Sequence, residues 1–80
     1  MTNPDQIKKW IEESLTCEHV EVGGDGQHFE AVIVSPAFRG KSRVQQHQLV
    51  YRALGERMRG EIHALSMKTL TPEDWAGPQS

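Results

Sequence analysis

Apolar side chains recur at helical spacing near the start of the chain. They lie three or four positions apart, so one face of a helix collects Ile7, Trp10, Ile11 and Leu15. Asn3 is a preferred N-cap residue, Pro4 suits the first helical position, and Gln6 can complete a capping box. The pattern predicts a helix over residues 4–15.

Two short stretches after this helix have the length and apolar character of strands. They cover residues 19–22 and 29–34, and the cluster Gly23-Gly24-Asp25-Gly26 between them favours a turn. The pair predicts a β-hairpin with a glycine-rich loop. The run from Ala31 to Val34 is apolar on both faces, which indicates a central strand covered by helices.

A second helical pattern covers residues 42–58. Ser42 and Gln45 form a capping-box signature at its start. The apolar stripe that follows has heptad-like spacing and consists of Val44, His47, Tyr51, Leu54 and Met58. Gly55 weakens the helix near its C-terminal end, and Gly60 is suited to terminate it. The stripe predicts one long helix that packs through this face.

The rest of the chain predicts one more strand and a short final helix. Residues 62–68 have strand character, and residues 35–38 form a short turn after the second strand. Thr71 is a good N-cap, Pro72 suits the first helical position, and Trp75 is expected to anchor this last turn to the body.

The predicted order is helix, strand, strand, helix, strand and short helix. A helix lies between the second and third strands, which favours a parallel, right-handed connection. We therefore expect an α+β fold, a two-layer αββαβ sandwich with a three-stranded mixed sheet and helices on one face. A single domain is expected over residues 1–76, followed by a frayed tail at 77–80.

Composition narrows the class of protein. The chain has 80 residues, of which 36% are hydrophobic and 25% charged, as in ordinary soluble domains. No apolar run approaches the roughly 20 residues of a membrane-spanning helix, and the first residues lack the pattern of a signal peptide. Cys17 is the only cysteine, so an internal disulfide and an all-cysteine metal site are excluded. We expect a cytoplasmic protein that does not associate with membranes.

The net charge of −2 hides an asymmetry between the two halves of the chain. Residues 1–34 have a balance of −5, residues 35–68 a balance of +5, and residues 69–80 a balance of −2. Within the basic half, Arg39, Lys41 and Arg43 alternate just before a predicted helix, where free amides favour anions. This loop is either a solvated segment or a docking site for a partner carboxylate or a nucleic-acid phosphate.

The four histidines have different surroundings in the predicted fold. His19 is expected to be an exposed edge residue, and His47 on the helical stripe is typical of a packed, hydrogen-bonded side chain. His28 ends the glycine-rich loop, and His63 begins the third strand. If Ile62 and Ala64 face the helices, His63 faces the open side of the sheet. Two imidazoles near one surface could form half of a metal site, but two histidines 35 residues apart without a third ligand motif are more often a chance placement.

No motif for enzymatic catalysis stands out. A nucleophile elbow, a zinc-protease helix and a phosphate-binding loop are all missing from the sequence. Cys17 has the character of a small, buried or half-buried hydrophobe, with a thiolate ligand or redox role as the alternative. Trp10, His47, Tyr51 and Trp75 are expected to be structural. The sequence therefore favours a binding or adaptor protein over an enzyme.

Three segments resemble the BolA family, and within it the short bacterial IbaG type. They are Gly24–Phe29, Phe38–Tyr51 and Ile62–Trp75, and together with their spacing they extend the resemblance over essentially the whole chain. The resemblance implies an αββαβ fold like that of a type II KH domain. This agrees with the order of elements predicted from the residues alone.

The resemblance also implies a partner and a cofactor. Members of the family pair with monothiol glutaredoxins whose active site reads Cys-Gly-Phe-Ser, and the two proteins share a bridging 2Fe–2S cluster with glutathione. The family's two ligand positions correspond to His63 and His28, and no cofactor is expected in the isolated chain. Imidazole ligands make such a cluster less negative and sensitive to acid, because protonated imidazole cannot bind a metal.

The implied role is iron–sulfur trafficking or iron homeostasis, within a stress response. The alternative is a DNA-binding transcriptional regulator that acts through the basic loop 39–43 and the KH-like fold. KH domains bind nucleic acid through a GxxG loop, which this chain lacks, so nucleic acid is the less favoured partner. A weak homodimer is a further candidate assembly.

Overall fold

The computed structural model describes residues 2–25, 27–60, 62 and 64–76. His63 and the predicted tail 77–80 lie outside the described residues. The elements are α1 (Pro4–Ser14), β1 (His19–Gly24), β2 (His28–Val34), the 3-10 helix η1 (Pro36–Phe38), α2 (Arg43–Leu54), α3 (Arg57–Gly60), β3 (Ala64–Leu70) and α4 (Pro72–Ala76). Their order confirms the predicted one and adds α3.

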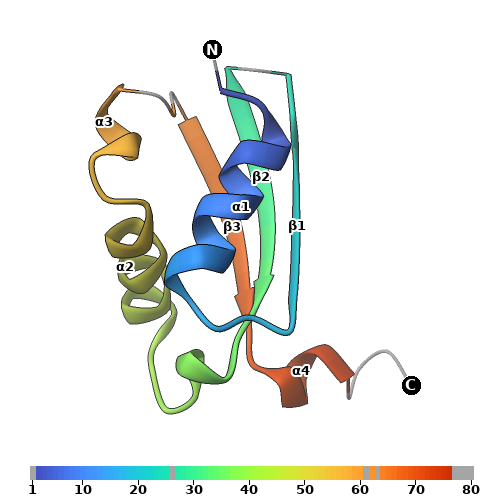
Figure 1. The fold of residues 1–80 in the computed structure, drawn as a ribbon. Coiled ribbons are helices and arrows are strands. Elements are labelled where there is room, and N and C mark those ends of the chain that lie inside the picture. Colours follow the sequence, from blue (N-terminus) through green and yellow to red (C-terminus); the bar gives the residue numbers. More distant parts are fainter. Residues whose placement is uncertain (1, 26, 61, 63, 77–80) are drawn as a thin grey trace.

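The three strands form one mixed sheet in the order β1-β2-β3. β1 runs antiparallel to β2, with His19 opposite Val34, and β2 runs parallel to β3, with His28 opposite Ala64. In Figure 1, α1 lies across the sheet, α2 lies beside β3, and α4 follows the end of β3. The mixed sheet and the parallel crossover confirm the predicted fold class.

The hydrophobic core lies between the helices and one face of the sheet. Alternate residues of β2 point into it, because side chains along a strand alternate between its two faces. The buried core residues are Ile7, Ile11, Val20, Phe29, Ala31, Ile33, Phe38, Val50, Leu54 and Ile62. The opposite face of the sheet carries the exposed residues Glu21, His28, Glu30, Ser66 and Lys68. The fold therefore has one packed face and one open face.

Local capping chemistry explains where the helices begin. The Asn3 side chain accepts a hydrogen bond from the amide of Gln6, and Pro4 opens α1, as predicted. Ser42 and Gln45 form the reciprocal capping box expected at the start of α2. The Thr71 hydroxyl accepts from the amide of Asp74 at the start of α4. Within the part of the chain that is described, no helix is long and apolar enough to cross a membrane.

The predicted long helix over residues 42–58 is wrong in one respect. The structure divides this stretch into α2, which ends at Leu54, and α3, which begins at Arg57. Gly55 lies between them with a φ of 58°, in the left-handed region that glycine adopts without a steric penalty. Gly55 therefore terminates α2 and does not merely weaken it.

The buried face of α2 also differs from the predicted stripe. Val44 is 67% exposed and Tyr51 is 42% exposed, whereas Val50 and Leu54 are buried. His47 is half-buried beside them. A heptad-like stripe assumes that a helix packs along its whole length, but α2 contacts the sheet and α1 through a neighbouring face. Tyr51 is thus a surface residue of α2.

β3 begins two residues later than predicted, at Ala64. Ile62 is only 2% exposed and belongs to the core, whereas Ala64 lies opposite the exposed His28. Paired residues of adjacent strands share a face, so Ala64 belongs to the open face. The premise that Ile62 and Ala64 both face the helices is therefore wrong.

The two tryptophans connect elements at opposite ends of the molecule. The Arg57 guanidinium lies 4.7 Å from the centre of the Trp10 ring, a cation–π contact between α3 and α1. The Trp75 ring of α4 stacks on His19, with ring centres 4.7 Å apart and an interplanar angle of 19°. These contacts hold the two short C-terminal helices against the N-terminal half.

Candidate functional site

His28 lies at the point where the glycine-rich loop enters β2, and it is exposed. The carboxylate of Asp25 accepts hydrogen bonds from the amides of Gln27 and His28, each at 2.9 Å. In return, the amide of Asp25 donates to the carbonyl of His28 at 3.3 Å. The loop thus fixes the backbone of His28 while its imidazole remains accessible.

Gly24 makes this tight loop possible. Its φ is 150°, and a Cβ built there would lie only 2.3 Å from the carbonyl oxygen of His28. Glycine allows the end of β1 to approach the start of β2 this closely. Sequence reasoning identified the loop as a turn but missed the roles of Gly24 and Asp25. The signal in the sequence was the position of Asp25. Its side chain can accept hydrogen bonds from the amides two and three residues further along the chain, as in an Asx turn.

We expect Asp25→Ala to loosen the loop around His28. The substitution removes the acceptor of two amides, so their hydrogen exchange should become several-fold faster. Asp25→Asn retains a side-chain oxygen and should change these rates much less. NMR-detected exchange at Gln27 and His28 measures both effects, and equal rates in wild type and Asp25→Ala would contradict the expected role.

The same interactions make the loop sensitive to pH. Hydrogen bonds from the amides of His28 and Gln27 hold the pKa of the Asp25 carboxyl below its ordinary value. The folded-state pKa is thus lower than the unfolded one. The resulting stabilisation is complete above the unfolded pKa and is lost as the pH falls through the folded-state pKa.

The register of the sheet sets the neighbours of His28. In the parallel pair of β2 and β3, His28 lies opposite Ala64, and the exposed Glu30 lies opposite Ser66. His63 directly precedes Ala64 in the chain, but it lies outside the described residues. Among the residues that are described, no three His, Cys, Asp or Glu side chains form a group able to hold a metal ion. Described groups from this chain alone therefore do not complete a metal site.

The other two histidines lie away from this end of the sheet. His19 lies opposite Val34 at the far end of β1, where its ring contacts Glu21 at 2.6 Å. His47 lies on α2, and its Nε2 atom is buried without a hydrogen-bond partner among the described residues. Neither residue shares the surroundings of His28.

Cys17 lies between α1 and β1 and is half-buried. Burial raises the pKa of its thiol to about 11, and the carboxylate of Glu12 adds to the shift. The thiol is therefore protonated near neutral pH, which disfavours both nucleophilic attack and metal binding.

We expect Cys17 in the folded protein to react slowly with iodoacetamide. At about pH 7.5 its alkylation should be about a hundredfold slower than that of glutathione, because the reactive thiolate is scarce. Mass spectrometry of timed samples measures the rate, and unfolding in urea should restore it. Fast alkylation of the folded protein would contradict the assigned protonation state.

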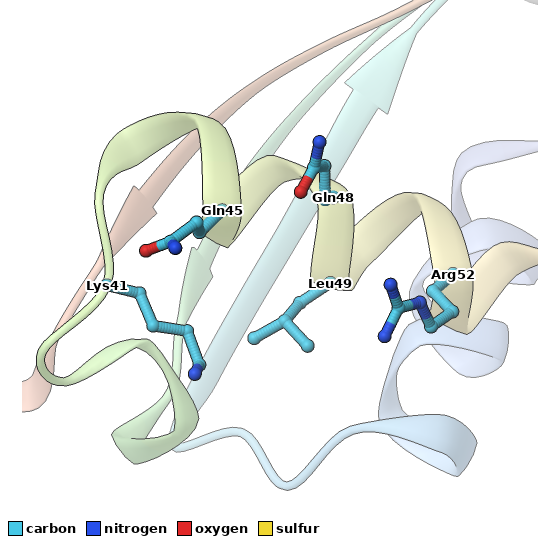
Figure 2. A pocket seen from close by; sticks show the side chains of 5 residues that line it. All are labelled: Lys41, Gln45, Gln48, Leu49 and Arg52. Carbon is cyan, nitrogen blue, oxygen red and sulfur yellow. The ribbon is translucent and has the colours of Figure 1, made fainter.

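The three cations of the basic loop do not converge on one site. The Arg39 guanidinium donates to both carboxylate oxygens of Glu73, and this pairing raises the pKa of Arg39 and lowers that of Glu73. Lys41 instead lines a shallow hollow of about 150 Å³, in which Leu49 lies between Lys41 and Arg52 (Figure 2). Arg43 lines a different hollow, between α2 and β3. The sequence alone did not reveal that Arg39 forms an ion pair with Glu73.

Comparison with protein families gives a direct match. The profile described as BolA-like protein matches residues 9–74. The acid stress protein IbaG of Escherichia coli strain K12 is 40% identical over 73 residues, which cover 90% of this chain and 87% of that protein. Protein BOLA2 of Arabidopsis thaliana is 44% identical over 83 residues, which cover 98% of this chain and 88% of that protein.

Solved structures agree with this match. A bolA protein homologue from Coxiella burnetii is 46% identical, with a TM-score of 0.83, and the alignment covers 94% of this chain and 97% of that one. The BolA domain of SufE1 from Arabidopsis thaliana is 37% identical, with a TM-score of 0.74, over 86% of this chain and 91% of that one. These matches confirm the resemblance seen in the sequence, and the chain belongs to the BolA family.

Proposed function

We propose that this protein is a non-enzymatic iron–sulfur adaptor. In this role it pairs with a monothiol glutaredoxin of the Cys-Gly-Phe-Ser type and helps to bind a bridging 2Fe–2S cluster through His28 and His63. The observation that carries the proposal is the parallel register, which sets the exposed His28 opposite Ala64, the residue that follows His63. The proposed ligands are 35 positions apart in the chain, and the register sets the residue after His63 opposite His28.

Covalent geometry supports this pairing. Adjacent strands lie about 4.8 Å apart, and consecutive Cα atoms are about 3.8 Å apart across a trans peptide. Ala64 therefore lies about one strand spacing from His28, and His63 is the residue that precedes Ala64 in the chain. This register and this sequence adjacency support the pairing of the two proposed ligands.

The donor set is suited to a shared site. Neutral imidazole is a good ligand for iron, and two imidazoles provide half of the terminal ligands of a 2Fe–2S cluster. The partner would provide a cysteine thiolate, and glutathione a second thiolate. When bound, the cluster supplies one-electron redox chemistry and iron and sulfide for transfer. The chain's own contribution is to hold His28 in an ordered, solvent-facing position, through Asp25 and Gly24.

Reconstitution of the complex tests this function. The chain is mixed with a monothiol glutaredoxin, glutathione, iron and sulfide, and the products are analysed by gel filtration and visible circular dichroism. We expect a one-to-one heterodimer whose spectrum differs from that of the glutaredoxin reconstituted alone. A chain that elutes separately and leaves the glutaredoxin spectrum unchanged would refute the proposal.

DNA binding through the basic loop is the less supported alternative. A relative from Haemophilus influenzae, 44% identical over 52 residues, is named a DNA-binding transcriptional regulator. In this chain, however, Arg39 is engaged by Glu73, and Lys41 and Arg43 face different hollows. A salt-sensitive gel shift that is lost in Lys41→Ala would favour this alternative over the adaptor role.

A further inference from the structure

Two hollows lie side by side along the face of α2 that meets the end of α1. The first has a volume of about 150 Å³ and is lined by Lys41, Gln45, Gln48, Leu49 and Arg52. The second has a volume of about 250 Å³ and is lined by Ser14, Leu15, Leu49, Arg52 and Ala53. Because Leu49 and Arg52 line both, the two hollows form one continuous surface, here called the α1–α2 trough.

The trough is separate from both β3 and the proposed cluster site. Arg43, which lines the hollow beside β3, is nine positions before Arg52 in the chain. At about 100° per residue, these two side chains leave α2 on opposite sides. In Figure 1, the end of α1 and the start of α2 lie toward the opposite end of the sheet from the start of β2, where His28 lies. A partner bound in the trough therefore leaves His28 accessible.

The trough combines positive charge with apolar surface. Lys41 and Arg52 lie on either side of Leu49 (Figure 2), and Leu15 and Ala53 extend the apolar part. Among the described residues, no acidic side chain lines either hollow. Within the same part of the chain, neither cation forms an ion pair with a carboxylate. The trough is therefore complementary to an aliphatic side chain flanked by carboxylates.

Two glutamines add hydrogen-bond donors to this surface. The side-chain oxygen of Gln45 accepts from the amide of Ser42 in the capping box, so its NH2 group remains to donate. Gln48 is exposed and lines the same hollow. An ionised carboxylate accepts hydrogen bonds and donates none, so it is suited to a surface of cations and amide donors.

The loop that carries Lys41 is held in place by the fold. The amide of Lys41 donates to the carbonyl of Phe38 at 3.2 Å, and its carbonyl accepts from the side-chain amide of Gln46 at 3.1 Å. The side-chain oxygen of Gln46 in turn accepts from the Thr69 hydroxyl of β3 at 2.6 Å. Because the backbone of Lys41 is already ordered, less conformational entropy is lost when its side chain binds an anion.

We propose that the α1–α2 trough binds an acidic segment of a partner protein, in which an aliphatic side chain lies between two carboxylates. The aliphatic side chain rests against Leu49, and the carboxylates pair with Lys41 and Arg52. Gln45 and Gln48 donate hydrogen bonds to the same carboxylates. A nucleic acid fits this surface less well, because its phosphates carry no aliphatic side chain.

The length of the trough corresponds to a few residues of extended chain. Gln45 and Arg52 both line the first hollow and are seven positions apart in α2, which is about 10 Å along the helix axis. In an extended chain, residues i, i+2 and i+4 share one face, and the first and last of them are about 13 Å apart. The pattern Glu-x-Leu-x-Glu therefore presents its three side chains to one face over a similar length.

Three peptides with blocked termini test the proposal. They are Glu-Ser-Leu-Ser-Glu, Gln-Ser-Leu-Ser-Gln, which lacks the carboxylates, and Glu-Ser-Ser-Ser-Glu, which lacks the aliphatic side chain. In NMR titrations of the wild-type chain to about 10 mM peptide, the first should bind about tenfold tighter than the second and about threefold tighter than the third. The amide signals of Gln48, Leu49 and Ala53 should shift. Raising the salt from about 50 to about 300 mM should weaken this binding several-fold.

Charge variants locate the site. Lys41→Ala and Arg52→Ala should each weaken binding of Glu-Ser-Leu-Ser-Glu by about three- to fivefold. Arg43→Ala is the matched control, because Arg43 is an exposed cation of α2 that lines the hollow beside β3 instead. Its affinity should stay within about 1.5-fold of wild type. All three side chains are exposed, so thermal unfolding should show that the variants remain folded.

Several results would overturn the proposal. Equal affinity for the first two peptides, no shift at the highest concentration of Glu-Ser-Leu-Ser-Glu, or an equal loss in Arg43→Ala and Arg52→Ala would each do so. Displacement of the peptide by an equal concentration of inorganic phosphate would show that the trough binds small anions only. A single-stranded oligonucleotide that shifts Gln48, Leu49 and Ala53 at a lower concentration than the peptide would assign the trough to nucleic acid instead. Because no glutaredoxin or cluster is present, these results are independent of the adaptor function.

Discussion

Gly24→Ala is expected to lower the free energy of unfolding by about 2–6 kcal/mol. Alanine is strained at a φ of 150°, a cost of about 1–3 kcal/mol. Its Cβ would also lie 2.3 Å from the carbonyl oxygen of His28 and 2.9 Å from the Cα of Phe29. Both are backbone atoms of β2, so the start of that strand must move, and overpacking of this kind adds about 1–3 kcal/mol. Urea unfolding followed by far-UV circular dichroism measures the loss.

Gly23→Ala provides a matched control one residue earlier. A Cβ at Gly23 has no atom within 4 Å, and Gly23 has no positive φ. We expect its free energy of unfolding to stay within about 0.5 kcal/mol of wild type. If the two variants lose stability equally, the close approach of Gly24 to His28 is not what requires glycine there.

The elements that the sequence predicted well are those fixed by local chemistry. Asn3, Ser42 and Thr71 each cap a helix through a contact three residues away, so a short stretch of sequence contains the whole interaction. The hairpin follows from a glycine cluster between two apolar stretches. The parallel crossover follows from the helix between β2 and β3. In each case the deciding residues are neighbours in the chain.

The features that the sequence did not predict depend on contacts between distant residues. Arg39 and Glu73 are 34 positions apart, and only the folded chain brings them together. The face of α2 that packs inward is set by its docking onto α1 and the sheet, which leaves Tyr51 exposed. A glycine at position 55 looks the same in the sequence whether the helix continues through it or ends there, so the end of α2 was not predictable from this residue alone.

The candidate site was likewise predictable from the sequence only in part. The chemistry of His28 and His63 was visible as residue types, and the family resemblance selected them among four histidines. The register that sets His28 opposite Ala64 is a property of the whole sheet, since it depends on how β3 returns beside β2. Periodicity placed Ile62 and Ala64 on one face, and the structure places them on two.

Replacing either proposed ligand is expected to abolish the cluster of the reconstituted heterodimer. His63→Ala and His28→Ala each remove an imidazole, so one iron loses a terminal ligand and the visible circular dichroism of the heterodimer should disappear. His19→Ala is the matched control, because His19 lies opposite Val34 at the far end of the sheet. Its spectrum should remain that of the wild-type complex. A wild-type spectrum in His63→Ala would refute the ligand assignment.

The variant His28→Cys distinguishes a loss of the metal ligand from a loss of folding stability. His28 is exposed, so His28→Ala and His28→Cys should both keep the free energy of unfolding within about 0.5 kcal/mol of wild type. His28→Cys offers a new metal ligand and should retain the cluster that His28→Ala loses. Because a thiolate adds negative charge where imidazole is neutral, the reduction potential of the cluster should fall, as measured by redox titration. A cluster that is retained in both variants with an unchanged potential would place the second ligand elsewhere in the chain, since a true ligand cannot be exchanged without changing the charge at the iron.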